Sequence, residues 1–162
     1  MNHHIAGALL MSSLKTIEEF FSLPRLAVVG VSRSGKGFGA SAFRTLKGNG
    51  LDVTPINRSG GLIDGIPLVN SLRSLAGKID GVVIVTPPDQ SVSVIDDAIA
   101  AGVRQIWFQP GSDSPDAFRS CNEAGLSYVH KECVLMFAPP VKGGHYIHSL
   151  LRRLMGRMPA VE

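Results

Sequence analysis

Residues 25–39 read RLAVVGVSRSGKGFG. The first part, Arg25 to Gly30, is a short apolar run that ends in glycine, which is typical of a strand buried on both faces of a parallel sheet. The second part is a glycine-rich loop that continues into a segment over 39–47 whose apolar spacing predicts a helix. A buried strand, a glycine-rich turn and a helix in this order predict the start of a βαβ unit.

The same alternation recurs along the chain. Apolar runs rich in Val, Ile or aromatic residues predict four more strands, and helical patterns lie between them. A glycine stands at three predicted helix-to-strand joints, where it permits the left-handed conformation that ends helices. The pattern therefore predicts an α/β fold, a Rossmann-like doubly wound parallel sheet of about five strands in a single domain. The predicted strands cover 25–30, 52–57, 81–86, 104–109 and 126–130, the helices cover 39–47, 89–101 and 114–124, and the joint glycines are Gly50, Gly102 and Gly125.

The ends of the chain differ from this central sheet. A capping-box pattern at Thr16 and Glu19 predicts a short helix over 16–21, preceded by a loose segment over 1–14. Residues 60–75 carry several glycines and a proline, which predict a turn and one short helix. Apolar residues spaced three and four apart over 147–154 predict an amphipathic helix. We therefore expect one domain over 15–137, followed by an amphipathic helix and tail over 138–162.

Composition excludes several classes of protein. The 162 residues are 44% hydrophobic and 18% charged, as in a globular domain, and Lys plus Arg exceed Asp plus Glu by 16 to 13, a net charge of +3. This mild excess predicts no nucleic acid as a partner and fits an anionic small ligand better. Two cysteines cannot form a disulfide framework, and the apolar run Ile5 to Met11 is too short to span a membrane. We expect a cytoplasmic protein without a membrane partner.

The loop from Gly30 to Gly39 is the first candidate site. A glycine-rich loop before a helix presents backbone N–H groups and the positive end of the helix dipole, which together bind anions such as phosphate. The alternative is that the glycines only permit a tight turn between strand and helix.

Two nucleotide-binding patterns almost match this loop. The Walker A pattern fits from Gly30 to Lys36, but Gly37 replaces the hydroxyl residue that holds magnesium. The dinucleotide pattern G-x-G-x-x-G has Ser32 in place of its middle glycine, and the second strand ends in Asn57 and Arg58 where NAD would require a carboxylate. A cation at that place suits a ribose that carries a phosphate.

No catalytic residues can be assigned from the spacing of the polar side chains. The glycine loop does not match the nucleophile-elbow pattern, and no base and nucleophile form a recognisable pair. Cys133, His145 and His148 lack a fourth ligand for a zinc site, so we expect no metal. We expect Cys133 to be a small apolar residue of the interior rather than a reactive thiol.

Four motifs in order resemble the small stand-alone CoA-binding domain family. They are GVSRSG at 30–35, PIN at 55–57, VTPP at 85–88 and AIAAGVRQIWFQPG at 98–111. The resemblance covers about residues 15 to 137. This family is similar to the N-terminal CoA-binding domain of the succinyl-CoA synthetase alpha subunit, which has a Rossmann-type fold.

The resemblance implies a set of CoA-binding residues. The first loop would hold the CoA phosphates, and Asn57 with Arg58 would meet the ribose phosphate. Thr86, Pro87 and the following Pro88 would form a wall beside the nucleotide, although the prolines could instead only start the next helix. Gln109 would lie near the pantetheine arm or, alternatively, in solvent. The implied loop residues are Gly30, Ser32, Arg33, Lys36, Gly37 and Gly39.

We therefore expect a protein that binds CoA or an acyl-CoA and has no catalytic residues of its own. A first alternative is an NADP-dependent oxidoreductase in which the same loop and Arg58 bind the cofactor. A second is an interaction subunit of a split acyl-CoA synthetase, which docks on a partner enzyme through the helix over 147–154. That helix could also join copies of this chain into a homo-oligomer.

Overall fold

The computed structural model describes residues 12–139. Its centre is a five-stranded sheet in the order β2-β1-β5-β6-β7, and every neighbouring pair of strands is parallel. All residues of β1, β5 and β6 are buried, as the continuous apolar runs predict. The predicted Rossmann-like α/β fold is confirmed. The strands are β1 Leu26–Val29, β2 Val53–Ile56, β5 Gly81–Ile84, β6 Gln105–Phe108 and β7 Ser127–Val129.

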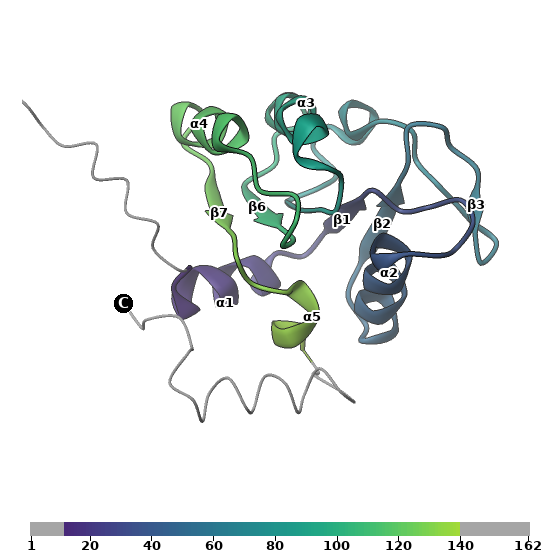
Figure 1. Ribbon diagram of the computed structural model, residues 1–162. Helices are drawn as coiled ribbons and strands as arrows, with labels where there is room; N and C mark the ends of the chain where they lie inside the picture. Colours follow the sequence, from purple (N-terminus) through teal and green to yellow (C-terminus); the bar gives the residue numbers. More distant parts are fainter. Residues whose placement is uncertain (1–11, 140–162) are drawn as a thin grey trace, which may run out of the picture.

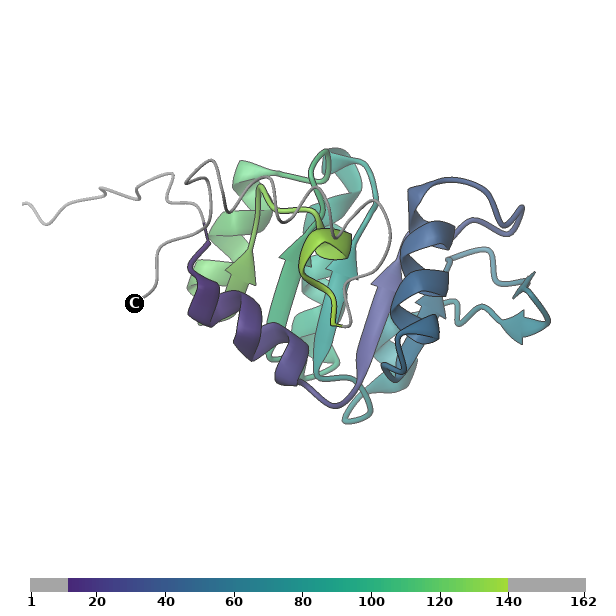
Figure 2. The ribbon, with the colours of Figure 1, turned by 90° about the horizontal axis from the view of Figure 1, so that it is seen from below.

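Helices cover both faces of the sheet (Figures 1 and 2). One face packs against α1 (Leu14–Ser22), α2 (Phe38–Gly48) and the short α5 (Val134–Phe137), with Phe20, Phe43 and Trp107 in its core. The other face packs against α3 (Pro88–Ala100), α4 (Pro115–Glu123) and the 3-10 helix η1 (Leu72–Leu75). Each helix buries one apolar side, which explains the spacing of three and four in the sequence.

The helix ends show how the local sequence sets these boundaries. The predicted cap at Thr16 is wrong, because Ser13 is the N-cap of α1 and its Oγ accepts a hydrogen bond from the Thr16 N–H at 3.1 Å. The helix predicted over 114–124 has Ser114 as its N-cap, whose Oγ accepts a hydrogen bond from the Ala117 N–H. Gly50, Gly102 and Gly125 all have positive φ angles, so the three joints adopt the predicted left-handed conformation.

The segment between β2 and β5 contains more structure than predicted. The short helix expected in residues 60–75 is η1. The antiparallel hairpin formed by β3 (Leu62–Ile63) and β4 (Ile66–Pro67) was not predicted. The hairpin extends from the β2 side of the sheet, beside α2 (Figure 1). The predicted helix over 147–154 lies outside the described residues.

Candidate functional site

The order of the strands reverses between β1 and β5. After β1 the chain passes to β2 on one side, and β5 then pairs with β1 on the other side. In open α/β sheets, ligands bind outside the carboxyl ends of the strands at such a point. Gly30 follows β1 there, and a Cβ atom on Gly30 would lie 3.1 Å from the carbonyl carbon of Val85. The two strand ends are therefore tightly packed, and a ligand at this edge must lie above them or on either side.

The glycine loop, residues 30–37, joins β1 to α2 at this edge. Gly37 is the N-cap of α2 and has φ 85° and ψ 173°, and a Cβ atom there would meet no atom within 4 Å. A glycine supplies no capping side chain, so the first-turn N–H groups of α2 are left for water or a ligand. The first turn of α2 also contains no acidic residue. This helix end therefore has the electrostatics that favour an anion.

A comparison with the other helices supports this interpretation. Serine side chains cap α1, η1 and α4. Cys133, the N-cap of α5, forms no such bond, but the Gln109 side chain accepts from the first N–H of that helix. By contrast, α2 begins after Gly37 and α3 after Pro87, and neither of these residues forms a capping side-chain hydrogen bond. Both of the latter helices start at the reversal point, and α3 has Asp89 in its first turn. The α2 end is thus the better anion site of the two.

Two serine hydroxyls fill the glycine loop. The Oγ atoms of Ser32 and Ser34 are 2.8 Å apart, and the Ser34 N–H donates to Ser32 Oγ at 3.2 Å. The Lys36 N–H donates to Ser34 Oγ at 3.4 Å. The backbone N–H groups of Ser34 and Lys36 thus donate hydrogen bonds to hydroxyl oxygens of the same loop. The side chains of Arg33 and Lys36 are exposed at the same loop, so two cations accompany these donors.

One pocket lies on the β2 side of the glycine loop. This β1–β5 pocket has a volume of about 240 Å³ and is lined by Val29, Ile56 and Val94 on its apolar side and by Asn57, Arg58 and Gln90 among its polar residues. Gly30 and Thr86 also line it. Apolar walls with a few polar groups are typical of small-molecule sites.

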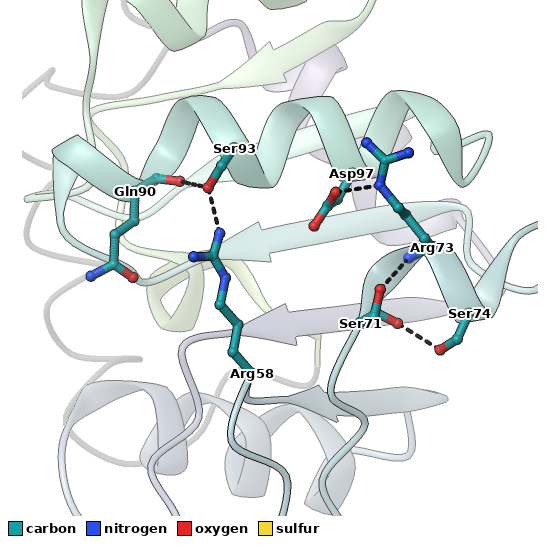
Figure 3. A network of polar contacts seen from close by, with 7 residues as sticks. All are labelled: Arg58, Ser71, Arg73, Ser74, Gln90, Ser93 and Asp97. Carbon is teal, nitrogen blue, oxygen red and sulfur yellow. Dashed lines mark hydrogen bonds and ion pairs between the residues drawn. The ribbon is translucent and has the colours of Figure 1, made fainter.

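Asn57 and Arg58 have different surroundings at this pocket. The Asn57 amide donates to the Val31 carbonyl at 2.8 Å and its Oδ1 accepts from the Ser59 N–H at 2.8 Å, so Asn57 ties the two loops together. The exposed Arg58 guanidinium reaches α3 and donates to Ser93 Oγ (Figure 3). The Arg58 side chain therefore extends from β2 to α3 at the pocket.

A second pocket lies on the β6 side. This β5–β6 pocket has a volume of about 440 Å³. Its lining combines the apolar residues Phe38, Val85, Pro87, Pro88 and Pro110 with the polar residues Thr86, Gln109 and Ser112. Pro88 is the first residue of α3, so the prolines both start the helix and line the pocket. Gln109 is buried, and its Oε1 accepts a hydrogen bond from the Val134 N–H at 3.1 Å.

The structure brings the predicted residues to one edge of the sheet. The glycine loop begins at Gly30, which lines the β1–β5 pocket, and leads to Phe38 at the start of α2, which lines the β5–β6 pocket. Thr86 lines both pockets. The Thr86 Oγ1 is buried and has no hydrogen-bond partner among the described residues. The sequence analysis missed Ser34, Phe38, Gln90 and Val94. Gln90 and Val94 are one helical turn apart, which was the only signal that they share a face.

Two further properties of the described part of the chain bear on function. Within residues 12–139, no three His, Cys, Asp or Glu side chains gather in a way that could hold a metal ion, and His145 and His148 lie outside that range. None of the helices between these limits is long and apolar enough to cross a membrane.

The fold and site define a Rossmann-like domain with a glycine loop between two pockets at the reversal point. The family model described as CoA binding domain matches residues 24–139. The chain therefore belongs to the CoA-binding domain family.

Similar proteins include small and large chains. A conserved hypothetical protein from Pyrococcus furiosus has 32% identity and a TM-score of 0.64, over 68% of this chain and 95% of that one. The uncharacterized protein YneT of Bacillus subtilis is 24% identical over 110 residues, which are 68% of this chain and 82% of that protein. The dinucleotide forming acetyl-coenzyme A synthetase 1 of Ca. Korarchaeum cryptofilum has 26% identity and a TM-score of 0.57, over 65% of this chain and 25% of the synthetase.

Proposed function

We propose that this protein binds CoA or an acyl-CoA at the carboxyl edge of its sheet and has no catalytic residues of its own. The observation that carries the proposal is the uncapped N-terminus of α2, which lies at the glycine loop between the β1–β5 pocket and the larger β5–β6 pocket. CoA has the matching three parts: an adenosine with a 3′-phosphate, a central diphosphate and a long, largely uncharged pantetheine arm. Membership of the CoA-binding domain family supports the same ligand.

Each part of CoA has a proposed place. The diphosphate binds the first-turn N–H groups of α2, that of Gly39 among them, and the loop residues Gly30, Ser32 and Gly37. Arg33 and Lys36 are the accompanying cations. The adenosine occupies the β1–β5 pocket, where Asn57 holds the loops and Arg58 binds the 3′-phosphate. The pantetheine arm lies along Thr86, Pro87 and Gln109 in the β5–β6 pocket.

A second candidate function rests on the acetyl-coenzyme A synthetase. That enzyme is about four times as long as the part that this chain matches, since the match covers 25% of it. We propose as the alternative that this chain is the CoA-binding subunit of a split acyl-CoA synthetase, with the remaining domains supplied by a partner enzyme. Co-purification with a partner that restores CoA-dependent acyl activation would favour this alternative over a free-standing binding protein.

A thermal-shift comparison of CoA, dephospho-CoA, NADPH and ATP at equal concentrations tests the ligand. A ligand at a hundredfold its Kd stabilises the native state by about 2.7 kcal/mol, and the melting temperature of a chain of this size rises by roughly 2–4 °C per kcal/mol. We expect the largest shift with CoA and a clearly smaller one with dephospho-CoA. A shift with NADPH alone would contradict the proposal and favour the oxidoreductase. Absence of a shift with all four would contradict binding by the isolated chain.

A further inference from the structure

Arg44 connects three parts of the structure near the glycine loop. It lies on α2, and its Nε and Nη2 donate to the two carboxylate oxygens of Asp64 at 2.6 and 2.8 Å. Its Nη1 donates to the Gly35 carbonyl at 2.6 Å. One guanidinium thus holds α2, the turn of the β3–β4 hairpin and the corner of the glycine loop. The planar fork of arginine suits such simultaneous, directed contacts better than a lysine ammonium does.

The corner at Gly35 is closely fitted to this guanidinium. A Cβ atom on Gly35 would lie 2.8 Å from Arg44 Nη2, and Gly35 has a φ of 68°. The Gly35 N–H donates to the Ser32 carbonyl at 3.0 Å. The flanking N–H groups of Ser34 and Lys36 are those that hold the serine hydroxyls. The position of Gly35 therefore sets the direction of the loop donors on both sides of it.

The hairpin contacts the glycine loop at a second point. A Cβ atom on Gly61 would lie 2.8 Å from Arg33 Cδ and 3.0 Å from Arg33 Cγ, so the hairpin packs against the stem of Arg33. Asp64, in the hairpin turn, has the positive φ of 50° that is uncommon outside glycine. Hairpin and loop are thus joined through Arg33 at one place and through Asp64 and Arg44 at the other.

The Arg44–Asp64 ion pair is exposed, with 42% and 51% of the two side chains accessible. Exposed ion pairs contribute little to folding stability. The pair can therefore be removed without unfolding the protein, which separates a role in the site from a role in the fold. The Arg73–Asp97 pair is a matched control because Arg73 is exposed and Asp97 is partly exposed, and the pair joins η1 to α3 without a residue of the glycine loop (Figure 3).

We propose that Arg44 and Asp64 are positioning residues for the phosphates of the ligand. Neither residue needs to touch the ligand. Arg44 fixes the Gly35 corner and thereby the path of the loop into the first turn of α2, whose N–H groups have no capping side chain. Asp64 fixes Arg44 and the hairpin that supports Arg33. This inference rests on the proposed binding of CoA, and it adds the hairpin to the binding apparatus.

The sign of the effect at Asp64 distinguishes positioning from simple attraction between charges. CoA is strongly anionic, so removal of a nearby negative charge in Asp64→Asn would strengthen CoA binding if only net charge mattered. Positioning by Asp64 predicts the opposite result. We expect Asp64→Asn to weaken CoA binding several-fold. We expect Arg44→Gln to weaken it about tenfold, the loss that corresponds to one charge-assisted hydrogen bond.

The experiment is isothermal titration of the full chain with CoA and with adenosine 3′-phosphate, which lacks the diphosphate. We expect the losses with CoA alone, near-unchanged melting temperatures, and no effect of Arg73→Gln. The double variant Arg44→Gln/Asp64→Asn should lose no more than Arg44→Gln does, because the two residues act together. Arg44→Lys should restore only part of the affinity, since lysine keeps the charge without the fork.

Results that contradict the positioning role of Arg44 and Asp64 differ from results that contradict CoA binding itself. Tighter CoA binding by Asp64→Asn, or full affinity in Arg44→Gln, would overturn the positioning role while CoA binding itself stands. Equal losses for CoA and adenosine 3′-phosphate would also overturn it, because the effect would not be confined to the diphosphate. If the unaltered chain binds neither CoA nor inorganic pyrophosphate, the proposed function and this inference both fail.

Discussion

A Cβ atom on Gly39 would lie 2.2 Å from the carbonyl oxygen of Gly30. Both groups belong to rigid parts of the backbone, the start of α2 and the end of β1, so neither can rotate away as a flexible side chain would. The close approach allows α2 to begin directly at the strand end. Because Gly39 lies so close to the Gly30 carbonyl, the glycine loop is short and stays between the two pockets.

Gly39→Ala should therefore displace α2 from β1. We expect a loss of about 3 kcal/mol in the free energy of unfolding, as for a forced overpacking of the interior. The control is Gly48→Ala in the same helix, where a Cβ atom would meet nothing within 4 Å and stability should change by no more than about 1 kcal/mol. Urea unfolding followed by circular dichroism measures both. Equal stability of the two variants would show that the helix can shift without cost.

Arg58→Ala should reduce the preference for CoA over dephospho-CoA. If Arg58 binds the 3′-phosphate, its loss should weaken CoA by about tenfold and leave dephospho-CoA nearly unchanged. Titration calorimetry with both ligands gives the ratio. Arg73→Ala is the control, because Arg73 pairs with Asp97 and does not line the pocket. Equal weakening of both ligands would mean that Arg58 does not distinguish the 3′-phosphate.

The fold was more predictable than the site, for physical reasons. Each central strand is a continuous apolar run because both of its faces are buried, so the sequence alone locates it within a residue or two. The β3–β4 hairpin has strands of two residues and α5 has only four residues, too short for any period to appear.

The candidate site was predictable only where it is local. The glycine loop is contiguous, so its residues could be named before the fold was known. Ser34 contacts residues only two positions away in the sequence, but none of the known motifs assigns a role to it. Gln109 was predicted beside the pantetheine arm, and it does line the β5–β6 pocket, but its bond to the Val134 N–H depends on how the chain after β7 returns. Such long-range approaches leave no periodic trace in the sequence.

Stability should fall in acid partly through Asp80. Arg25 donates to both carboxylate oxygens of Asp80 at 2.8 and 3.0 Å, and this pairing lowers the pKa of Asp80 below its ordinary value. A lowered folded-state pKa adds stability above the unfolded-state pKa of about 3.9, and that contribution disappears as the pH falls through the folded-state pKa. Asp80→Asn should thus be less stable at pH 7, and the difference from the unaltered chain should shrink as the pH falls through the lowered folded-state pKa of Asp80. A constant difference from pH 7 to pH 2 would contradict this.

Cys121 should be unreactive in the folded protein. It is fully buried on the α3 and α4 side of the sheet, and burial raises the pKa of its thiol to about 12. Only the thiolate is nucleophilic, so a disulfide reagent at pH 8 should modify Cys121 only after unfolding. The variant Cys133→Ser leaves Cys121 as the single thiol and isolates the measurement. Rapid modification without denaturant would show that α4 opens readily from the sheet.

The lack of a capping side chain at the start of α3 matters for attempts to stabilise the protein. Pro87 holds the N-cap position of α3 with φ −55° and ψ 153°, a conformation that a serine also adopts. Pro87→Ser would add the hydroxyl that stabilises other helix ends, a gain of about 1 kcal/mol. The same hydroxyl would bring a polar group into an apolar wall of the β5–β6 pocket and would hold N–H groups at its edge. A search for more heat-resistant variants would therefore favour this substitution while eroding the pocket, so melting temperature alone is a misleading criterion of improvement here.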